Sequence, residues 1–161
     1  MIIFGIDPGL NGAIAVFNNN KIKVVFEIPV MTEGKKNKKQ LNSAHLVKLL
    51  RDNLVENEET SVVVEQVNAM PGQGVTSMFN FGQTFGAIKG ICASLGLPIF
   101  FVRPSRWKKH FDLINSQKDS SRTKAIEMYP SLSNELSRKK DVNKADAILI
   151  ARYFFETNTS K

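Results

Sequence analysis

The first part of the chain consists of short apolar runs separated by turn residues. Residues 2–6 form an apolar run that ends at Asp-Pro-Gly, residues 12–17 form a second run, and residues 21–28 partly alternate apolar and polar positions. Short runs of this kind, bounded by Gly, Pro and Asn, are typical of β-strands. The pattern therefore predicts three strands joined by short turns, an antiparallel meander.

Helical and extended patterns alternate over the rest of the chain. Apolar residues recur every three or four positions in the longest predicted helix, whereas the strands are short apolar runs. In chain order, the predicted elements are a helix at 41–55, a strand at 61–67, a helix at 78–95, a strand at 97–102 and helices at 121–128 and 143–155. Three strands followed by this alternation predict an α/β fold with a mixed sheet flanked by helices.

Two segments depart from these regular patterns. Residues 32–40 contain four lysines and no hydrophobic residue, which favours a solvated, mobile loop. Gly82, Gly86 and Gly90 follow at four-residue intervals along the helix predicted at 78–95, although glycine disfavours helices. We therefore expect this helix to pack closely against a neighbour along its glycines.

The composition is that of a soluble globular protein. Of the 161 residues, 42% are hydrophobic and 23% are charged. We expect a single domain at 1–156 and a frayed tail at 157–161. The sole cysteine, Cys92, excludes an internal disulfide and a zinc site built from cysteines, and it favours a reducing compartment. No apolar run reaches the ~20 residues of a membrane span, and the N-terminus is unlike a signal peptide. We expect a cytoplasmic protein without a membrane partner.

The charge points to a polyanionic partner. Lysine and arginine number 22 against 15 acidic residues, which gives a net charge of +7 and a pI near 9.6. Such a pI is typical of proteins that bind nucleic acid, with plain solubility as the alternative. The basic residues are densest between 103 and 124, where we expect contacts to phosphates. They are Arg103, Arg106, Lys108, Lys109, Lys118, Arg122 and Lys124.

Three acidic residues stand in apolar surroundings, where an unpaired carboxylate is costly. Asp7 ends the first strand, Glu65 lies in the fourth, and Asp146 lies early in the last helix. The carboxylates converge if the first and fourth strands are neighbours. Such a cluster suits Mg²⁺ or Mn²⁺, and two ions about 4 Å apart catalyse phosphodiester hydrolysis. Singly, the residues are also compatible with a turn aspartate, an ion-paired glutamate and a helix-start aspartate.

Three motifs resemble those of RuvC-type Holliday junction resolvases, which belong to the RNase H-like superfamily. They are GIDPG at 5–9, VVEQV at 63–67 and ADAILIA at 145–151, in the family's order and spread over the chain. The segments MPGQG at 70–74 and MFNFG at 78–82 are most similar to the phage and organelle-type branch. The resemblance implies an RNase H-like mixed five-stranded sheet, with three antiparallel strands followed by parallel strands and with flanking helices.

The resemblance also implies an enzyme, a homodimeric, Mg²⁺-dependent endodeoxyribonuclease that resolves four-way DNA junctions. It would make paired symmetric nicks that leave 5′-phosphate and 3′-hydroxyl ends, and Mn²⁺ would replace Mg²⁺. Asp7, Glu65 and Asp146 would be catalytic metal ligands, and the helix at 78–95 is the expected dimer face.

The family's fourth acid is missing from its usual place. That aspartate lies three residues before the helix aspartate, where this chain has Asn143. We expect Asp141 to complete the catalytic and metal-binding set, provided that the last helix begins after it with Asn143 as its N-cap. As an alternative, Asp141 simply pairs with Lys139 or Lys140.

Two further roles follow from the resemblance. The segment 68–80 approaches the junction centre in the family, so Phe79, with Met78 second, is the candidate for stacking on an unpaired base. Lys108 and Arg122 resemble basic residues near the cut phosphate, where positive charge stabilises the transition state.

Other functions are also compatible with the sequence. The same acids would serve an RNase H-like nuclease acting on RNA or on branched DNA other than a four-way junction. The amide at Asn143 is instead compatible with a junction-binding protein of weakened catalysis. Substrate preference separates the nucleases, and metal-dependent cleavage separates both from the binding protein.

Overall fold

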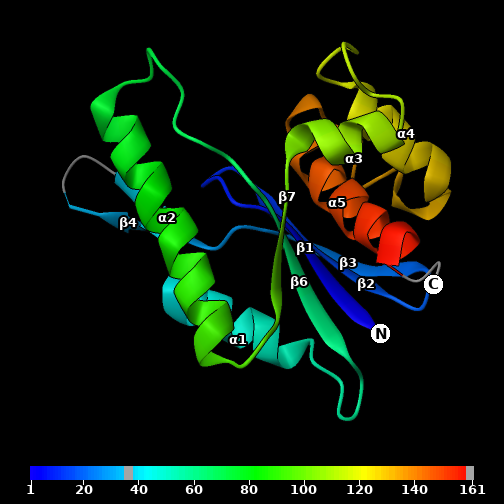
Figure 1. Cartoon of the computed structure of the whole chain (residues 1–161), viewed down its shortest axis with the longest axis horizontal. Helices are drawn as coiled ribbons and strands as arrows, with labels where there is room; N and C mark the ends of the chain where they lie inside the picture. Colours follow the sequence, from blue (N-terminus) through cyan, green and yellow to red (C-terminus); the bar gives the residue numbers. More distant parts are fainter. Residues whose placement is uncertain (35–37, 159–161) are drawn as a thin grey trace.

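The structure is a computed structural model that describes residues 1–34 and 38–158 (Figure 1). Its strands are β1 (Ile2–Asp7), β2 (Ala13–Asn18), β3 (Lys21–Glu27), β4 (Val30–Glu33), β5 (Lys38–Leu41), β6 (Thr60–Glu65) and β7 (Ile99–Val102). Its helices are α1 (Ser43–Asp52), α2 (Val75–Ser94), α3 (Pro104–His110), α4 (Ser120–Met128) and α5 (Val142–Asn158), with short 3₁₀ helices η1 (Pro130–Leu132) and η2 (Lys139–Asp141).

Five strands form one mixed sheet in the order β3-β2-β1-β6-β7. β2 runs antiparallel to both β1 and β3, whereas β6 runs parallel to both β1 and β7. This topology confirms the predicted sheet of three antiparallel strands followed by parallel strands. The first and fourth predicted strands, β1 and β6, are neighbours, with Ile6 opposite Val64.

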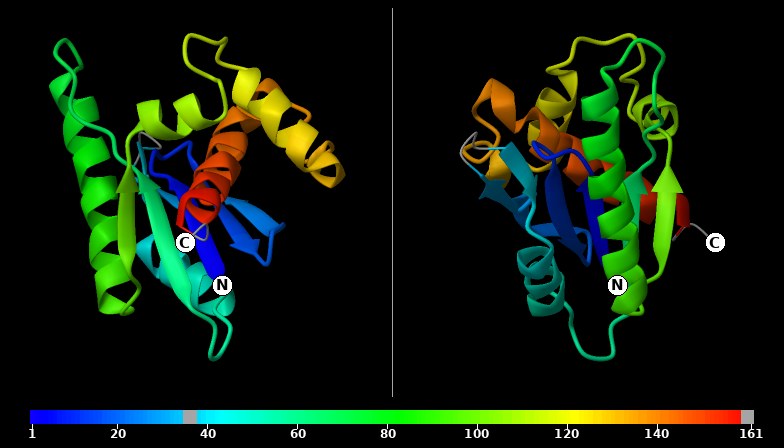
Figure 2. Two further views of the ribbon diagram at one scale, coloured as in Figure 1. Left: turned by 45° about the vertical axis from the view of Figure 1, so that its right-hand side comes forward. Right: turned by 90° about the vertical axis from the view of Figure 1, so that its left-hand side faces the viewer.

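Alternate residues of the central strands face two separate cores. Ile3 and Val63 pack with residues of α5 on one face. Phe4 and Val64 pack with residues of α1 and α2 on the other face. The left view of Figure 2 shows the sheet between these two helical layers. Because β1 and β6 are covered on both faces, their sequences are nearly continuous apolar runs.

Gly5 sets how closely α5 approaches the sheet. A Cβ atom at this position would lie 2.3 Å from the carbonyl oxygen of Ala147 and 2.7 Å from the backbone nitrogen of Ala151. Only a residue without a side chain permits this contact between β1 and α5. The close approach brings α5 against the strand that ends at Asp7.

The segment 32–40 differs from the predicted mobile loop. Strands β4 and β5 form an antiparallel hairpin in which Thr32 lies opposite Lys39. The two strands pair only with each other, so they lack the alternation that marks a strand packed on a core. Residues 35–37, which include two of the four lysines, lie outside the described residues.

The glycines of α2 also differ from expectation. Cβ atoms at Gly82, Gly86 and Gly90 would meet open space, so no neighbour within the described chain packs against these glycines, and the expected close packing stays a prediction for a partner outside it. The helix begins at Val75, three residues before its predicted start.

The C-terminal half contains two further differences. A short helix, α3, lies within the basic segment, with Trp107 as its buried residue. The last helix continues to Asn158, whose side-chain amide donates to the carbonyl oxygen of Phe154. Residues 157 and 158 of the expected tail are therefore helical, and residues 159–161 lie outside the described residues. Within the described chain, no helix is both long and apolar enough to span a membrane.

Candidate active site

The three predicted carboxylates lie on the face of the sheet that α5 covers. Asp7 ends β1 and continues the row of Ile3 and Gly5, and Glu65 ends the neighbouring strand β6. Asp146 lies in the second turn of α5, the helix packed on this face. Two parallel strands and one helix thus bring together three residues that are far apart in the sequence.

Each of these carboxyl groups has a raised pKa. Burial is the largest cause in every case, and for Asp7 the charges of Glu65 and Asp146 add to it and raise the pKa to about 7. Burial raises the pKa of Glu65, and the charge of Asp146 contributes to the increase; burial likewise raises the pKa of Asp146. Since carboxylates affect one another strongly only at short range, we treat Asp7, Glu65 and Asp146 as one acidic cluster.

Hydrogen bonds satisfy only part of the acidic cluster. The backbone N–H of Gly9 donates to Oδ1 of Asp7 at 3.4 Å, and the indole N–H of Trp107 donates to Oε1 of Glu65 at 2.9 Å. Oδ1 of Asp146 is buried and has no hydrogen-bond partner among the described residues. A buried carboxylate oxygen without a donor is suited to bind a cation.

Trp107 and Ser121 belong to the site, although the sequence patterns did not reveal them. Burial raises the pKa of Asp146, and the hydroxyl of Ser121, at the start of α4, partly offsets this increase. Trp107 is fully buried, and its N–H is directed at Glu65. The available signal was the single tryptophan of the chain within a strongly basic segment, because a buried indole needs a hydrogen-bond acceptor.

Asp141 is held away from the role expected of it. Its side chain is only 1% exposed, and its oxygens accept hydrogen bonds from the Arg138 guanidinium at 2.8 and 3.0 Å. Lys144 lies 3.5 Å from the same carboxylate. The hydrogen bond from Arg138 is the main cause that lowers the pKa of Asp141 well below its usual range. The expected fourth ligand is therefore corrected to an ion-paired structural residue, with Arg138 and Lys144 as its partners.

Asn143 faces the turn that follows Asp7. It lies three residues before Asp146 on α5, so the two side chains share one side of the helix. Its side-chain N–H donates to the backbone carbonyl oxygen of Asn11 at 2.7 Å, and Asn11 lies between β1 and β2. The site thus has an uncharged amide where the resemblance implies a carboxylate.

No protein-family model and no curated protein sequence matches the chain. Solved structures match its fold. Thermus thermophilus RuvC in complex with a Holliday junction substrate matches with a TM-score of 0.65 and 18% identity, over 100% of this chain and 98% of that chain. Another Thermus thermophilus RuvC structure matches with a TM-score of 0.57 and 19% identity, over 100% of this chain and 99% of that chain. The fowlpox virus Holliday junction resolvase matches with a TM-score of 0.51 and 17% identity, over 98% of this chain and 99% of that chain. The chain has the RuvC fold.

This likeness confirms the RNase H-like architecture that the three motifs implied. In this RuvC fold, two lysines of the predicted basic segment lie beside the acidic cluster. The charge of Lys108 offsets part of the burial effect on the pKa of all three acids, and Lys118 does so for Asp146. The ammonium of Lys108 lies 5.3 Å from the centre of the Trp107 ring, a favourable cation–π distance.

Other predicted DNA contacts are used within the fold. The Arg122 guanidinium binds Asp119 at 2.8 Å and the carbonyl oxygens of Leu136 and Ser137 at 2.8 and 2.9 Å. Its expected phosphate contact is therefore corrected to a structural role, in which it joins α4 to the segment that follows η1. Lys124 is also partly engaged, since it lies 3.7 Å from Glu127.

The remaining predicted contacts are at the surface or near it. Arg103, Arg106 and Lys109 have exposed side chains on or next to α3. Phe79 is 64% exposed, whereas Met78 is partly buried. Both lie in the first two turns of α2 rather than in the preceding loop.

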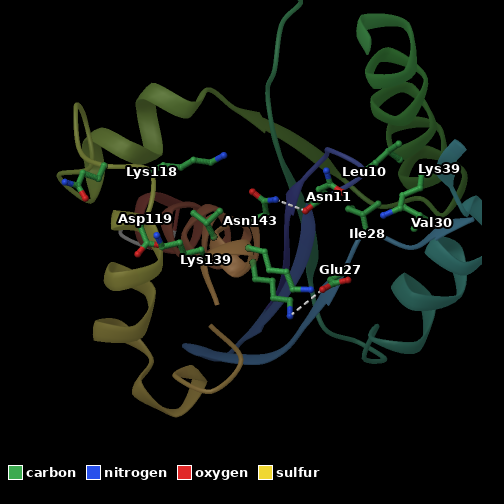
Figure 3. A pocket seen from close by; sticks show the side chains of 15 residues that line it. Leu10, Asn11, Glu27, Ile28, Val30, Lys39, Lys118, Asp119, Lys139 and Asn143 are labelled. Atoms are coloured by element: carbon green, nitrogen blue, oxygen red, sulfur yellow. Dashed lines mark hydrogen bonds and ion pairs between the residues drawn. The ribbon is translucent and has the colours of Figure 1, made fainter. Parts of the chain in front are cut away.

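A cleft of about 850 Å³ opens beside Asn143 (Figure 3). One wall contains residues from the β1–β2 turn, β3 and the β4–β5 hairpin, and the opposite wall contains residues 117–119, 139–140 and 142–144. We call it the lysine cleft, because five lysines line it. They are Lys39, Lys118, Lys139, Lys140 and Lys144.

The acidic cluster offers donor atoms that suit a divalent cation. Carboxylate oxygens are the hard ligands that Mg²⁺ and Mn²⁺ favour. Within residues 1–34 and 38–158, no three Asp, Glu, His or Cys side chains are gathered closely enough to be assigned as a metal site. The unpartnered oxygen of Asp146 and the raised pKa values nevertheless fit such an ion by the chemistry of the donors.

Proposed function

We propose that the protein is a structure-selective endodeoxyribonuclease that resolves four-way DNA junctions. The observation that carries the proposal is the acidic cluster at the ends of β1 and β6, in a fold that matches a junction-bound RuvC over nearly the whole of both chains. The net charge of +7, with Lys108 beside the cluster, supports a polyanionic substrate. Residues 1–156 would act as one nuclease domain in the cytoplasm.

We infer that Mg²⁺ is the cofactor and that Mn²⁺ can replace it. Asp7, Glu65 and Asp146 would hold the metal, with the amide oxygen of Asn143 as an uncharged fourth donor. When bound, the metal would activate water and stabilise the leaving oxygen in phosphodiester hydrolysis. The expected products carry 5′-phosphate and 3′-hydroxyl ends.

The chain's own residues would orient the reacting groups and balance their charge. Trp107 holds one oxygen of Glu65 through its N–H. Lys108 and Lys118 would stabilise the additional negative charge of the transition state. Phe79, which is largely exposed on α2, would stack on an unpaired base at the junction centre.

Two symmetric nicks require two active sites, so we propose a homodimer. The exposed face of α2 is the candidate interface, because its glycines Gly82 and Gly86 meet open space and Val75 is 84% exposed. A two-fold axis would place the same face of both protomers in contact. Sedimentation or light scattering should give the mass of two chains.

The test is cleavage of a labelled four-way junction beside a linear duplex and an RNA–DNA hybrid, with Mg²⁺ and with EDTA. We expect paired nicks in the junction alone, lost in EDTA and in Asp146→Asn, which should still bind the junction. Cutting of the hybrid would favour a general RNase H-like nuclease. Binding without cutting would mean that the amide at Asn143 has weakened catalysis.

A further inference from the structure

The lysine cleft carries more positive charge than its own carboxylates can neutralise. Its five lysines face two acidic lining residues, Glu27 and Asp119. Glu27 lies 3.9 Å from Lys144, and Asp119 is bound by Arg122. Lys39, Lys118 and Lys140 form no ion pair with any described residue. The cleft therefore presents free ammonium groups to a ligand.

The free lysines stand on both walls of the lysine cleft. Lys39 comes from β5 on one wall, and Lys118 and Lys140 line the opposite wall. Figure 3 shows Lys39 and Lys118 on opposite sides of the cleft. The two walls are joined across the floor by the Asn143–Asn11 hydrogen bond and by the Lys144–Glu27 ion pair. A linear polyanion lying along this floor would have cations on either side.

One end of the lysine cleft meets the acidic cluster. Lys118 lines the cleft and also acts electrostatically on Asp146, and Asn143 lines it one helical turn before Asp146. A phosphodiester backbone that passes the acidic cluster would therefore continue into the cleft.

We propose that the lysine cleft binds the sugar–phosphate backbone of one DNA strand as it leaves the acidic cluster, with the β4–β5 hairpin as one side of the clamp. The inference rests on the proposed function for the identity of the strand. We assign one strand as the occupant because the cleft continues from the acidic cluster, which would take one phosphodiester, and because its volume of about 850 Å³ is that of a small-ligand pocket. The lysines would contact phosphates and so bind without reading the bases.

The test compares two double variants that each remove two exposed lysines. Lys39→Ala with Lys140→Ala removes one free lysine from each wall, and Lys21→Ala with Lys23→Ala on β3 is the matched control outside the cleft. Both are made in the Glu65→Gln chain, so that a fluorescent four-way junction binds without being cut. Dissociation constants are then measured over a range of KCl concentrations.

We expect the cleft variant to reduce the slope of log affinity against log salt by about two, one for each lost lysine–phosphate contact. The control should keep the slope of the parent chain. Equal slopes for the cleft variant and its parent would overturn the proposal, as would equal losses in the cleft and control variants.

Neutral methylphosphonate substitutions in the cut strand then locate the contacts. Methylphosphonates next to the cut, on one side of it only, should weaken binding by the parent chain. The same substitutions should have much less effect on binding by the cleft variant. Equal effects on both proteins would contradict a strand in the cleft. These binding results are independent of cleavage by the unmodified chain: a junction that is bound in this way but never cut would contradict the proposed function and leave the cleft assignment standing.

Discussion

At the scale of single residues, the carboxylates of the acidic cluster are buried close together, and hydrogen bonds from the protein satisfy only some of their oxygens. Asp7 shows this most clearly, because burial and then the charges of Glu65 and Asp146 raise its pKa to about 7. Between pH 3.8, the ordinary pKa of an aspartate, and about pH 7, Asp7 keeps its proton in the folded chain but releases it in the unfolded chain. Stability contributed by the protonated form is therefore lost as the pH rises through this window.

Asp7→Asn should consequently stabilise the metal-free protein at pH 8. The rise of the pKa from 3.8 to about 7 corresponds to up to about 4 kcal/mol in the free energy of unfolding, and the gain should shrink towards pH 4. Urea unfolding at both pH values, in EDTA, measures it. The exposed Asp52→Asn change on α1 is the control and should have little effect at either pH. A destabilised Asp7→Asn protein at pH 8 would contradict the buried, mutually repelling carboxylates of the acidic cluster.

Trp107→Phe should change how the site titrates. The variant keeps an aromatic ring but removes the N–H that donates to Glu65, and a hydrogen bond to a charged group contributes about 1.5–3 kcal/mol. Burial already raises the pKa of Glu65, and this bond lowers it. Without the bond, the acidic limb of the rate–pH profile should move to higher pH by about one unit. Phe111→Leu, a buried change at the end of α3, should leave the limb in place; a shift of equal size there would assign the effect to packing.

Substitutions at Asp141 and Asn143 should have different effects, the first on stability and the second on metal-dependent cleavage. Asp141→Asn leaves Arg138 and Lys144 without their buried partner and should cost about 1–3 kcal/mol of stability. The low pKa of Asp141, caused mainly by Arg138, means that this contribution is present above its ordinary pKa and is lost as the pH falls. Asn143→Asp should instead leave stability nearly unchanged and lower the Mg²⁺ concentration needed for half-maximal cleavage. Thermal melts and metal titrations distinguish the two, and the reverse pattern would restore Asp141 as a ligand.

At the scale of secondary structure, the contact between β1 and α5 determines where Asp146 lies. Gly5→Ala would place a methyl group 2.3 Å from the carbonyl oxygen of Ala147. Overpacking of this kind costs roughly 1–3 kcal/mol, and the displaced α5 should carry Asp146 away from Asp7, so cleavage should fall more than stability explains. Gly90→Ala on α2 meets open space and should raise stability slightly through helix propensity. Similar melting temperatures for Gly5→Ala and the unmodified chain would contradict this packing.

The sequence best predicted the elements in which hydrophobic residues recur at the spacing of a helix or a strand. Strands β1, β2 and β6 and helices α1, α2 and α5 each bury at least two hydrophobic residues, and these were recognised. The β4–β5 hairpin was missed because its strands pair only with each other, and α3 because a seven-residue helix with one buried tryptophan has little periodicity.

The same distinction applies to the candidate site. Asp7, Glu65 and Asp146 were recognisable because each interrupts an apolar segment. The ion pairs of Asp141 and Arg122 depend on residues three positions away in local turns, Arg138 and Asp119, and on carbonyl oxygens that only the folded chain brings near. Charge density alone therefore overestimated the number of basic residues available to DNA.

At the scale of the whole molecule, the acidic and basic residues around the candidate site lie in separate regions. The acidic cluster lies on one face of the sheet, with Lys108 and Lys118 next to it and the lysine cleft beyond Asn143. Under the proposed function, this basic surface around a small acidic centre would attract a nucleic acid and would direct one phosphodiester to the carboxylates. The exposed face of α2 leaves room for a second copy on the far side of the sheet from α5.

The most direct test of the central claim is a time course of strand cleavage on a four-way junction labelled on opposing strands. The unmodified protein in Mg²⁺ should nick both strands at symmetric positions, while Glu65→Gln should bind the junction with similar affinity and lower the cleavage rate by at least about 100-fold. Cleavage by Glu65→Gln at the rate of the unmodified protein would show that the acidic cluster is not the catalytic centre.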